Sequence, residues 1–422
     1  MKIILVNYRY FISGGPERYY FNIKEVLEKQ GHEVIPFSIK SSHNLPNDYE
    51  KYFLDIVDDE VYFAQAKKSL KVVLKSFTRM FYSFEAKKKF KQLLQDTKPD
   101  LVYIMQFHNK ISPSIIDAAK SLNIPVVHRI SDFQYMCPNA LFYNDVKGVC
   151  EDCLKGKRLN CVKYKCVLNS TVYSGIKMAA KWLHDVMRVT KKIDAFVVPS
   201  SFTLGRLREY GIPESRLRHI PTFFNLIEED PMVKYKPFVL FVGRIEKQKG
   251  LMTLIKAFEN TDYQLKIIGF SNDGYEDELK NYLHGKPHHI EFLGRKSFEE
   301  IIPYLKSCLC TTVPSEWYDN FPNVILESFA YKKAVIATDF GSLSELVRNH
   351  ETGLTFEYGD VNDFKSKIDY MFGHPEEARK MGEQSYRYIL SEYSPEVHYK
   401  QLYDLFESLV KSKKLQFIKK SK

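Results

Sequence analysis

Short apolar segments alternate with amphipathic helical patterns along the whole chain, and this alternation restricts the fold more than any other feature of the sequence. Strand and helix units that repeat in this way fold into parallel sheets covered by helices. Because the alternation runs twice, we predict an α/β protein with two doubly wound, Rossmann-like domains. The expected strands are Lys2–Asn7, Glu33–Phe37, Leu101–Met105, Pro125–His128 and Ala195–Pro199 in the first series, and Phe238–Phe241, Leu265–Ile268, Ile290–Leu293, Cys308–Val313 and Ala334–Ala337 in the second.

A proline-rich, acidic stretch separates the two series. A chain of 422 residues is too long for one ordinary hydrophobic core. Pro221, Pro231 and Pro237 surround the acidic run Glu228–Asp230, as expected of a connector. Ligands of open α/β sheets bind beyond the carboxyl ends of the strands, so the cleft between the domains is the expected site. The predicted divisions are residues 1–220, a linker 221–237, residues 238–391 and a C-terminal segment 392–422.

Two carboxylates lie close to a predicted helix start in the segment Pro314–Glu327. The apolar run Cys308–Val313 precedes this segment like a buried strand, and Pro322 suits a first helical position, where a missing N–H costs nothing. Asp319 then falls in the loop, and Glu327 falls about one and a half turns into the helix. The two acids can therefore contact different parts of one ligand whose phosphates lie at the helix N-terminus.

This segment resembles the E-x7-E motif of retaining glycosyltransferases of family four, which have a GT-B fold. Seven residues separate the two acids here. Further segments follow the family pattern in the same order, and the resemblance covers nearly the whole chain. They are Phe241–Gly250, similar to the G-R-x-x-x-x-K-G element, Ile267–Gly269, Ala334–Thr338 and Gly341–Glu345.

The resemblance implies a role for each matching residue. Arg244 and Lys249 would hold the donor diphosphate, since arginine presents a fork of donors and lysine a point charge. Glu327 would accept hydrogen bonds from the ribose hydroxyls, and Asp319 would contact sugar hydroxyls. These four are the predicted catalytic residues. The predicted donor-binding residues are Gly14, Gly15, Gly243, Gly269, Asn320, Phe321, Pro322, Asn323 and Glu345.

The glycines at 14 and 15 carry a second interpretation. They follow the first predicted strand and open a helix, where they would let the backbone approach a ligand. Taken from the residues alone, an ordinary strand–helix turn explains two glycines equally well. The family resemblance favours the site, because related enzymes have a glycine-rich loop there.

Two positions depart from the family pattern. The leading acid is Asp319, one methylene shorter than the usual glutamate, and we expect function to survive. The segment Pro125–Asp132 resembles P-V-V-x-T-x-H-D but has Ser131 where a histidine near the acceptor is usual. His108 resembles a second histidine position of the family, although a lone histidine at a strand end is more often structural. The predicted acceptor-side residues are His108, Ser131 and Asp132.

Retention of configuration is implied by the resemblance alone. No carboxylate pair in the sequence demands a double displacement, so we expect a front-face attack in which the leaving phosphate oxygen takes the proton of the acceptor. No D-x-D motif lies between the two series. We expect no metal or other cofactor in catalysis, because arginine, lysine and helix dipoles neutralise the diphosphate.

Five of the seven cysteines fall in an insertion, residues 137–166, that follows the acceptor-side segment. The Cys150-x-x-Cys153 pair fits half of a zinc knuckle, and two later cysteines would complete a tetrahedral site. Disulfides explain the cluster less well in a reducing compartment, and irregular spacing leaves packed, reduced thiols as the alternative. The predicted ligands of a structural zinc are four of Cys137, Cys150, Cys153, Cys161 and Cys166, in a loop expected to shape the acceptor entrance.

The formal net charge of +10 is concentrated in two stretches. Basic residues from Lys67 to Lys89 interleave with aliphatic and aromatic ones, a pattern typical of amphipathic helices that bind anionic bilayers. A helix that covers the first sheet is at least as compatible with this pattern. The tail Lys411–Lys422 adds positive charge and is expected to be disordered at its end. We find no recognised nucleic-acid module and expect no nucleic-acid partner.

The two ends of the chain carry further expectations. No apolar run approaches the roughly 20 residues that span a bilayer, and Met1–Asn7 is too short for a secretory segment. We therefore expect a soluble, cytoplasmic chain, peripheral at the inner face of the cell membrane if the basic region binds lipid. An apolar stripe predicts a helix from Pro395 to about Leu409. In the GT-B fold such a helix crosses back to the first domain, and closure about it would exclude water from the donor.

We predict a glycosyltransferase that moves a hexose or related sugar from a nucleoside-diphosphate sugar to a glycan or polyprenyl-linked saccharide, in capsule or lipopolysaccharide biosynthesis. A synthase or phosphorylase of the same fold is one alternative. A catalytically silent GT-B protein with a binding or assembly role is another, favoured by Ser131 and Asp319 and opposed by Arg244, Lys249 and Glu327. The base, the sugar and the linkage depend on loop shapes that motifs do not encode.

Overall fold

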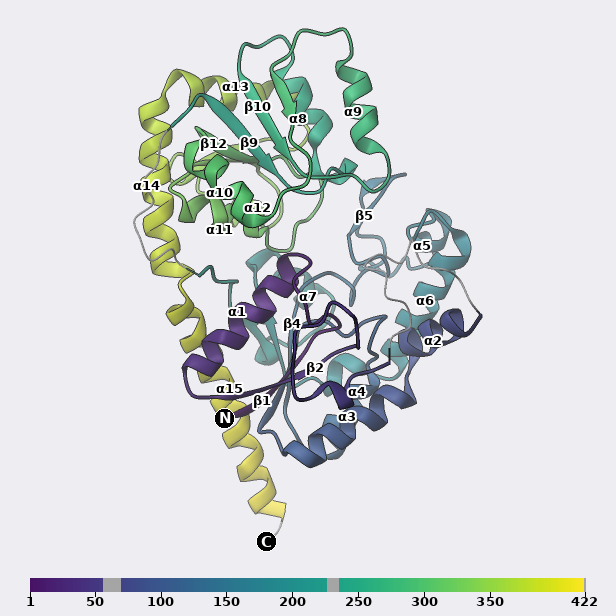
Figure 1. Cartoon of the computed structure of the whole chain (residues 1–422). Helices are drawn as coiled ribbons and strands as arrows, with labels where there is room; N and C mark the ends of the chain where they lie inside the picture. Colours follow the sequence, from purple (N-terminus) through teal and green to yellow (C-terminus); the bar gives the residue numbers. More distant parts are fainter. Residues whose placement is uncertain (56–69, 226–234, 421–422) are drawn as a thin grey trace.

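Two parallel six-stranded sheets form the centres of two lobes (Figure 1). The computed structural model describes residues 1–55, 70–225 and 235–420. The strand orders are β2-β1-β3-β4-β7-β8 and β11-β10-β9-β12-β13-β14, which confirms the predicted α/β fold. The strands are β1 Lys2–Val6, β2 Glu33–Phe37, β3 Leu101–Ile104, β4 Val126–Arg129, β7 Ala195–Val198 and β8 Leu217–His219 in the first lobe, and β9 Phe238–Val242, β10 Gln264–Ile268, β11 Ile290–Phe292, β12 Cys310–Val313, β13 Val335–Thr338 and β14 Gly353–Phe356 in the second.

Helices cover both sheets (Figure 1). Those of the first lobe are α1 Gly15–Lys29, α2 Leu70–Phe81, α3 Phe84–Thr97, α4 Ser114–Ser121, α5 Asn160–Lys163, α6 Thr171–Val186 and α7 Ser201–Glu209. Those that follow are α8 Leu251–Phe258, α9 Tyr275–Leu283, α10 Phe298–Ser307, α11 Asn323–Ala330, α12 Leu343–Leu346, α13 Val361–Gly373, α14 Pro375–Glu392 and α15 Pro395–Lys420. In the described part of the chain, no helix is long and apolar enough to cross a membrane.

All ten predicted strands are present, and the sequence pattern missed the last strand of each sheet. Strand β8 spans three residues, two of them exposed, so it lacks an apolar run. Strand β14 begins at Gly353, where a Cβ would lie 2.0 Å from the carbonyl oxygen of Val335. The glycine is therefore a strand residue that permits close approach to β13, whereas a glycine in a sequence ordinarily indicates a turn. The short hairpin β5 Tyr143–Asn144 and β6 Gly148–Val149 in the Cys-rich insertion was also missed.

In each sheet the first strand lies in the interior, and later strands are added first on one side of it and then on the other, so the strand order reverses there. Strand β1 pairs with both β2 and β3, and β9 pairs with both β10 and β12. The crevice beyond the carboxyl ends of strands at such a reversal is where open α/β sheets bind ligands. The loops after β1 and β3, and those after β9 and β12, are therefore the segments that the fold itself offers for a site.

The C-terminal helix α15 packs on the first lobe, and Figure 1 shows it in yellow beside α1 and β1. Leu402, Leu405 and Phe406 are buried in the same apolar cluster as Leu5 and Tyr103. The helix reaches Lys420, and the end of the basic tail, where disorder is expected, lies outside the described residues.

The two connections between the lobes lie side by side. The backbone N–H of Phe224 donates a 3.0 Å hydrogen bond to the carbonyl oxygen of Tyr393. The predicted linker 221–237 contains residues 226–234, which lie outside the described residues. The chain therefore enters and leaves the second lobe through neighbouring segments.

His398 on α15 makes the contact between this helix and the first lobe sensitive to acid. Its ring nitrogens lie 2.7 Å from the carbonyl oxygen of Pro221 and 2.9 Å from the hydroxyl of Tyr19. Burial lowers the pKa of His398 to about 3, whereas a free histidine has a pKa of about 6.5. Below about pH 6.5 only the unfolded chain takes up this proton, so stability is lost as the pH falls from about 6.5 towards about 3.

We therefore expect His398→Gln, which cannot titrate, to show a weaker loss of stability on acidification. Between pH 7.5 and 5 the wild-type chain would lose about 2 kcal/mol of unfolding free energy through this residue. Urea unfolding at both pH values measures the difference. Buried His128, whose pKa is also lowered to about 3, remains in both proteins and serves as the common background. Equal acid sensitivity of variant and wild type would contradict the prediction.

Candidate functional site

The loops after β9 and β12 bring the predicted basic and acidic residues together. Lys249 ends a short 3-10 helix, Lys247–Lys249, and its amine lies 2.8 and 3.1 Å from the two carboxylate oxygens of Asp319. The hydroxyl of Ser315 donates a further hydrogen bond of 2.6 Å to Asp319. Arg244 bonds Glu246 at 2.7 Å, and the charges of Lys249 and Asp319 also act on Glu246. Both predicted diphosphate ligands are thus held in position by carboxylates.

Close backbone packing explains two glycines of this region. A Cβ at Gly269 would lie 1.9 Å from the carbonyl oxygen of Gly243, which joins the loops after β9 and β10. Gly250 has φ +70°, and a Cβ there would lie 1.8 Å from the carbonyl oxygen of Pro314. Glycine at 250 therefore allows the Lys249 turn to touch the segment that leads to Asp319.

Glu327 lies on α11 and is almost fully buried, at 4% exposure. Burial raises the pKa of Glu327, and the nearby charge of Arg18 opposes this effect. The guanidinium of Arg18, on α1 of the first lobe, lies 2.8 Å from the Glu327 carboxylate. The predicted ribose ligand is therefore paired with the other lobe in this structure. Arg18 follows the predicted glycine pair on α1, and no sequence motif indicated a role for it.

The start of α1 also touches the start of α11. A Cβ at Gly15 would lie 2.8 Å from the side-chain amide of Asn323, which is the first residue of α11. Pro322 is the residue before the helix, one position earlier than predicted. Gly14 is extended and has room for a side chain, so packing does not require glycine there. The aromatic ring of Phe321 lies 6.0 Å from that of Tyr393.

Two predicted donor-binding residues join the lobes. The side chain of Asn320 donates to the carbonyl oxygen of Ile130 at 3.0 Å and accepts from the hydroxyl of Thr203 at 2.7 Å. The carboxylate of Glu345 accepts from the backbone N–H groups of Ser201 and Phe202 at the start of α7. Both side chains therefore fix how the second lobe meets the first.

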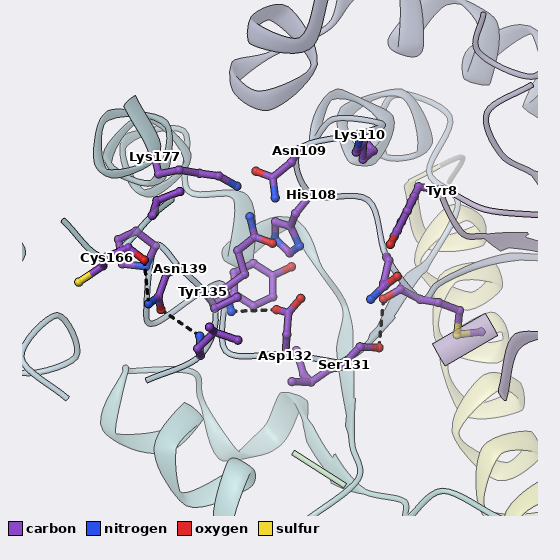
Figure 2. A pocket seen from close by; sticks show the side chains of 18 of the residues that line it. Tyr8, His108, Asn109, Lys110, Ser131, Asp132, Tyr135, Asn139, Cys166 and Lys177 are labelled. Atoms are coloured by element: carbon purple, nitrogen blue, oxygen red, sulfur yellow. Dashed lines mark hydrogen bonds between the residues drawn. The ribbon is translucent and has the colours of Figure 1, made fainter. Parts of the chain in front are cut away.

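A cavity of about 420 Å³ lies in the first lobe beside this contact (Figure 2). The loops after β1, β3 and β4 form much of its wall, and the Cys-rich insertion and α6 close the other side. All three predicted acceptor-side residues line it. The lining residues are Tyr8, Met105, Gln106, His108, Asn109, Lys110, His128, Ile130, Ser131, Asp132, Gln134, Tyr135, Pro138, Asn139, Ala140, Leu141, Cys166, Val167, Leu168 and Lys177.

The titratable groups of the cavity are perturbed mainly by burial. Burial lowers the pKa of His108 well below its usual value, and His128 nearby adds to the effect, so His108 is neutral at pH 7. Burial raises the pKa of Asp132, whose carboxylate accepts one backbone hydrogen bond from Gln134. Ser131 accepts from Arg129 at 3.1 Å and donates to no titratable side chain among the described residues.

Comparison with known proteins identifies the family. The sequence profile of Glycosyltransferase Family 4 matches residues 13–227, about half of the chain, and that of Glycosyl transferases group 1 matches residues 224–388. The chain belongs to glycosyltransferase family 4. The boundary between the two matches falls at the connection between the lobes.

Relatives of this family 4 chain include proteins from archaea and bacteria. An uncharacterized glycosyltransferase of Methanocaldococcus jannaschii is 38% identical over 148 residues, which span 35% of this chain but only 41% of that relative. An uncharacterized 42.6 kDa protein in the cps region of Klebsiella pneumoniae is 23% identical over 359 residues, 82% of this chain and 88% of that protein.

Solved structures share the fold of this family 4 chain. Sucrose-phosphate synthase from Thermosynechococcus elongatus has a TM-score of 0.70 at 19% identity and covers 97% of this chain and 99% of its own. HepE of Anabaena in complex with UDP has a TM-score of 0.62 at 15% identity, over 97% of this chain and 100% of its own. These neighbours are GT-B glycosyltransferases, and the two-lobed fold of this chain is GT-B.

The cysteines of this family 4 chain gather behind one wall of the cavity. The thiol of Cys153 interacts with those of Cys137 and Cys161, and the thiol of Cys161 interacts with that of Cys166, which lines the cavity. Cys150 is more loosely connected and only half-buried. Within the residues that the structure describes, no three His, Cys, Asp or Glu side chains are arranged to hold a metal ion. The thiols thus form a connected row without a ready-made ligand set, and structural zinc stays a prediction.

The basic amphipathic stretch lies only partly within the described residues. Lys67 and Lys68 fall outside them. Arg79 is 2% exposed and lies 3.6 Å from the carboxylate of Glu85, so it belongs to the interior and adds nothing to a basic surface. Phe84, at 77% exposure, does face solvent. Binding of an anionic membrane stays a prediction.

Proposed function

We propose that the chain transfers a sugar from a nucleoside-diphosphate sugar to a saccharide acceptor, with retention of configuration. The observation that carries this proposal is the hydrogen bond from Asn320 to the carbonyl oxygen of Ile130. Asn320 directly follows Asp319 in the donor loop, and Ile130 and Ser131 line the cavity. A donor sugar held at Asp319 would therefore lie at the edge of the cavity that an acceptor would fill.

The donor would bind at the reversal point of the second sheet. Arg244 and Lys249 would give up part of their contact with Glu246 and Asp319 to the diphosphate, and the two cations would neutralise the leaving group. Glu327 would exchange its bond to Arg18 for bonds to the ribose hydroxyls. Three solved neighbours, HepE of Anabaena with UDP, with UDP and glucose, and with UDP-glucose, support a nucleotide-sugar partner.

The proposed reaction is a front-face displacement. The bond between the anomeric carbon and the phosphate oxygen breaks while the acceptor hydroxyl oxygen bonds the same carbon from the same face. The proton of that hydroxyl passes to the leaving phosphate oxygen, so no protein base is required. Asp132 is the one carboxylate among the residues that line the described cavity, which is consistent with a route that lacks a carboxylate nucleophile paired with a carboxyl acid.

The proposed biological setting is the synthesis of a cell-surface polysaccharide. A relative encoded in a cps region of Klebsiella pneumoniae, which aligns with most of this chain, supports that setting. The acceptor would be a glycan or a polyprenyl-linked saccharide, and the chain would work at the inner face of the cell membrane.

A panel of UDP-, GDP-, ADP- and dTDP-sugars tests the proposal. We expect one donor to bind and to be hydrolysed slowly, and Arg244→Ala to lower this turnover at least about a hundredfold, since loss of a donor to a developing oxyanion costs about that much. The matched control is Lys247→Ala, a neighbouring exposed cation that pairs loosely with Glu278. The anomeric configuration of a transfer product, read by NMR, tests retention.

Three outcomes would contradict the assignment in different ways. Binding of no donor would favour the silent GT-B module. Phosphorolysis of a glycan would favour a phosphorylase of the same fold. An equal loss in Lys247→Ala would show that Arg244 acts only through overall charge.

A further inference from the structure

One charged group of the cavity has no hydrogen-bonding or ion-pair partner among the residues that the structure describes. Helix α6 follows the Cys-rich insertion and carries Lys177, whose side chain extends into the cavity towards Asn109 and His108 (Figure 2). Among the described residues, its amine makes no hydrogen bond or ion pair. Lys181, one turn later on the same helix, bonds the carboxylate of Asp185 at 2.6 Å and the hydroxyl of Tyr210 at 2.8 Å. The amine of Lys181 is therefore paired, whereas the amine of Lys177 points into the cavity.

The unpaired amine is a cation in a half-buried position. Burial lowers the pKa of Lys177 to about 8, so it is still largely protonated at pH 7. Lys110 lies nearby and also lines the cavity, and its charge lowers this pKa further. Opposing them is a single lining carboxylate, that of Asp132. A half-buried cation without a hydrogen-bonded counter-ion is costly, so an anionic ligand group would supply the contact to Lys177 that the more distant Asp132 does not make.

A second unpartnered atom belongs to a residue that lines the same cavity. The side-chain carbonyl oxygen of Gln106 is buried and has no hydrogen-bond partner among the described residues. It can only accept a hydrogen bond, and a hydroxyl group is the natural donor. The cavity therefore presents a cation without an anionic hydrogen-bond partner, next to a residue whose buried oxygen lacks a donor. A saccharide with an acidic substituent would bring the missing anion.

We propose that the acceptor of this enzyme is an anionic saccharide, and that Lys177 binds its uronate carboxylate or phosphate group inside this cavity. This inference rests on the proposed function, since it takes the cavity as the acceptor site. Helix α6, which follows the Cys-rich insertion, would then carry the residue that distinguishes charged from neutral acceptors. Lys177 acts here as a specificity residue and touches no reacting atom.

Binding of three simple probes tests the inference: methyl glucuronide, glucose 6-phosphate and uncharged methyl glucoside. Each is titrated by ligand-observed NMR into the full chain saturated with the nucleotide that the donor panel identifies. We expect the better anionic probe to bind about tenfold tighter than the glucoside, as one hydrogen bond to a charged group contributes. Lys177→Met should abolish this preference and Lys177→Arg should keep most of it. The control Lys191→Met removes an exposed lysine of the same lobe and should change nothing.

The two anionic probes separate the sources of the charge, because a uronate site prefers the glucuronide and a phosphate site prefers the sugar phosphate. Equal binding of all three probes, binding of none, or an unchanged preference in Lys177→Met would overturn the inference. Nucleotide binding in the same samples keeps the two proposals distinct. If the nucleotide binds but the anionic probes are not preferred, only the role of Lys177 is refuted. If the nucleotide does not bind, the proposed function itself is refuted.

Discussion

Replacing Glu327 by alanine is expected to weaken binding of the donor nucleotide about a hundredfold. The carboxylate is buried, and among the described residues it pairs with Arg18 of the other lobe. In the complex it would accept two ribose hydroxyl hydrogen bonds. Each such bond to a charged group contributes at least about 1.5 kcal/mol, and about 3 kcal/mol corresponds to about a hundredfold in the dissociation constant. Isothermal titration with the preferred nucleotide measures the change.

Two controls separate this role from a structural one. Arg18→Ala breaks the same ion pair from the other side, and it should weaken nucleotide binding far less if Glu327 contacts the ribose. The 2′,3′-dideoxy form of the nucleotide should bind the wild-type chain about as weakly as the normal nucleotide binds Glu327→Ala. Equal effects of the two substitutions, with no discrimination against the dideoxy form, would reduce Glu327 to a contact between the lobes.

Alanine at Gly250 is expected to cost at least about 3 kcal/mol of folding stability and to abolish turnover. A left-handed backbone costs a residue with a Cβ about 1 to 2 kcal/mol, and the Cβ would also lie 1.8 Å from the carbonyl oxygen of Pro314. That overlap is with backbone, so the loop that carries Ser315 and Asp319 must move away from Lys249. Thermal unfolding and donor hydrolysis on the same preparation measure both effects.

Gly274→Ala provides the matched control. Gly274 also has a positive φ, +80°, yet nothing lies within 4 Å of a Cβ placed there. It should lose only the conformational cost, about 1 kcal/mol, and keep its activity. Similar losses in both variants would show that the close contact between Gly250 and Pro314 does not hold the site together.

The contact between Lys249 and Asp319 could be predicted because the loops that carry them follow neighbouring strands. Lys249 and Asp319 are far apart in sequence, but they follow β9 and β12, which pair in the sheet. A sequence that reveals parallel strands therefore also reveals which loops meet at their carboxyl ends. The 2.8 Å contact between these two side chains follows directly from that topology.

Contacts between the lobes could not be predicted in the same way. Arg18 and Glu327 are 309 residues apart, and the bond from Asn320 to Ile130 spans 190. Both depend on how two separately folded sheets face each other, which no periodicity in the chain records. Lys177 gave no signal either, because a lysine on an amphipathic helix is ordinarily solvated. Only the fold of the insertion directs it into a cavity.

The cysteines show that a motif can predict which residues meet without predicting their geometry. Their number and grouping predict a metal site, and the structure does bring four thiols into a row. Ligand spacing constrains which cysteines can meet, whereas the thiol of Cys137 is directed by its hydrogen bond to the side-chain oxygen of Asn139. The spacing of the cysteines in the sequence therefore does not establish that four sulfur atoms form a tetrahedral metal site.

The second lobe begins and ends at neighbouring residues, because the backbones of Phe224 and Tyr393 are hydrogen-bonded to each other. Its two ends meet at one point, so the whole lobe can be exchanged for that of a relative through two neighbouring junctions, while α15 and the first sheet remain intact. Recombination at these junctions would exchange the loops that carry Arg244, Lys249 and Asp319 as one unit. A new lobe would have to keep the bond from position 320 to Ile130, because Ile130 lines the cavity of the first lobe.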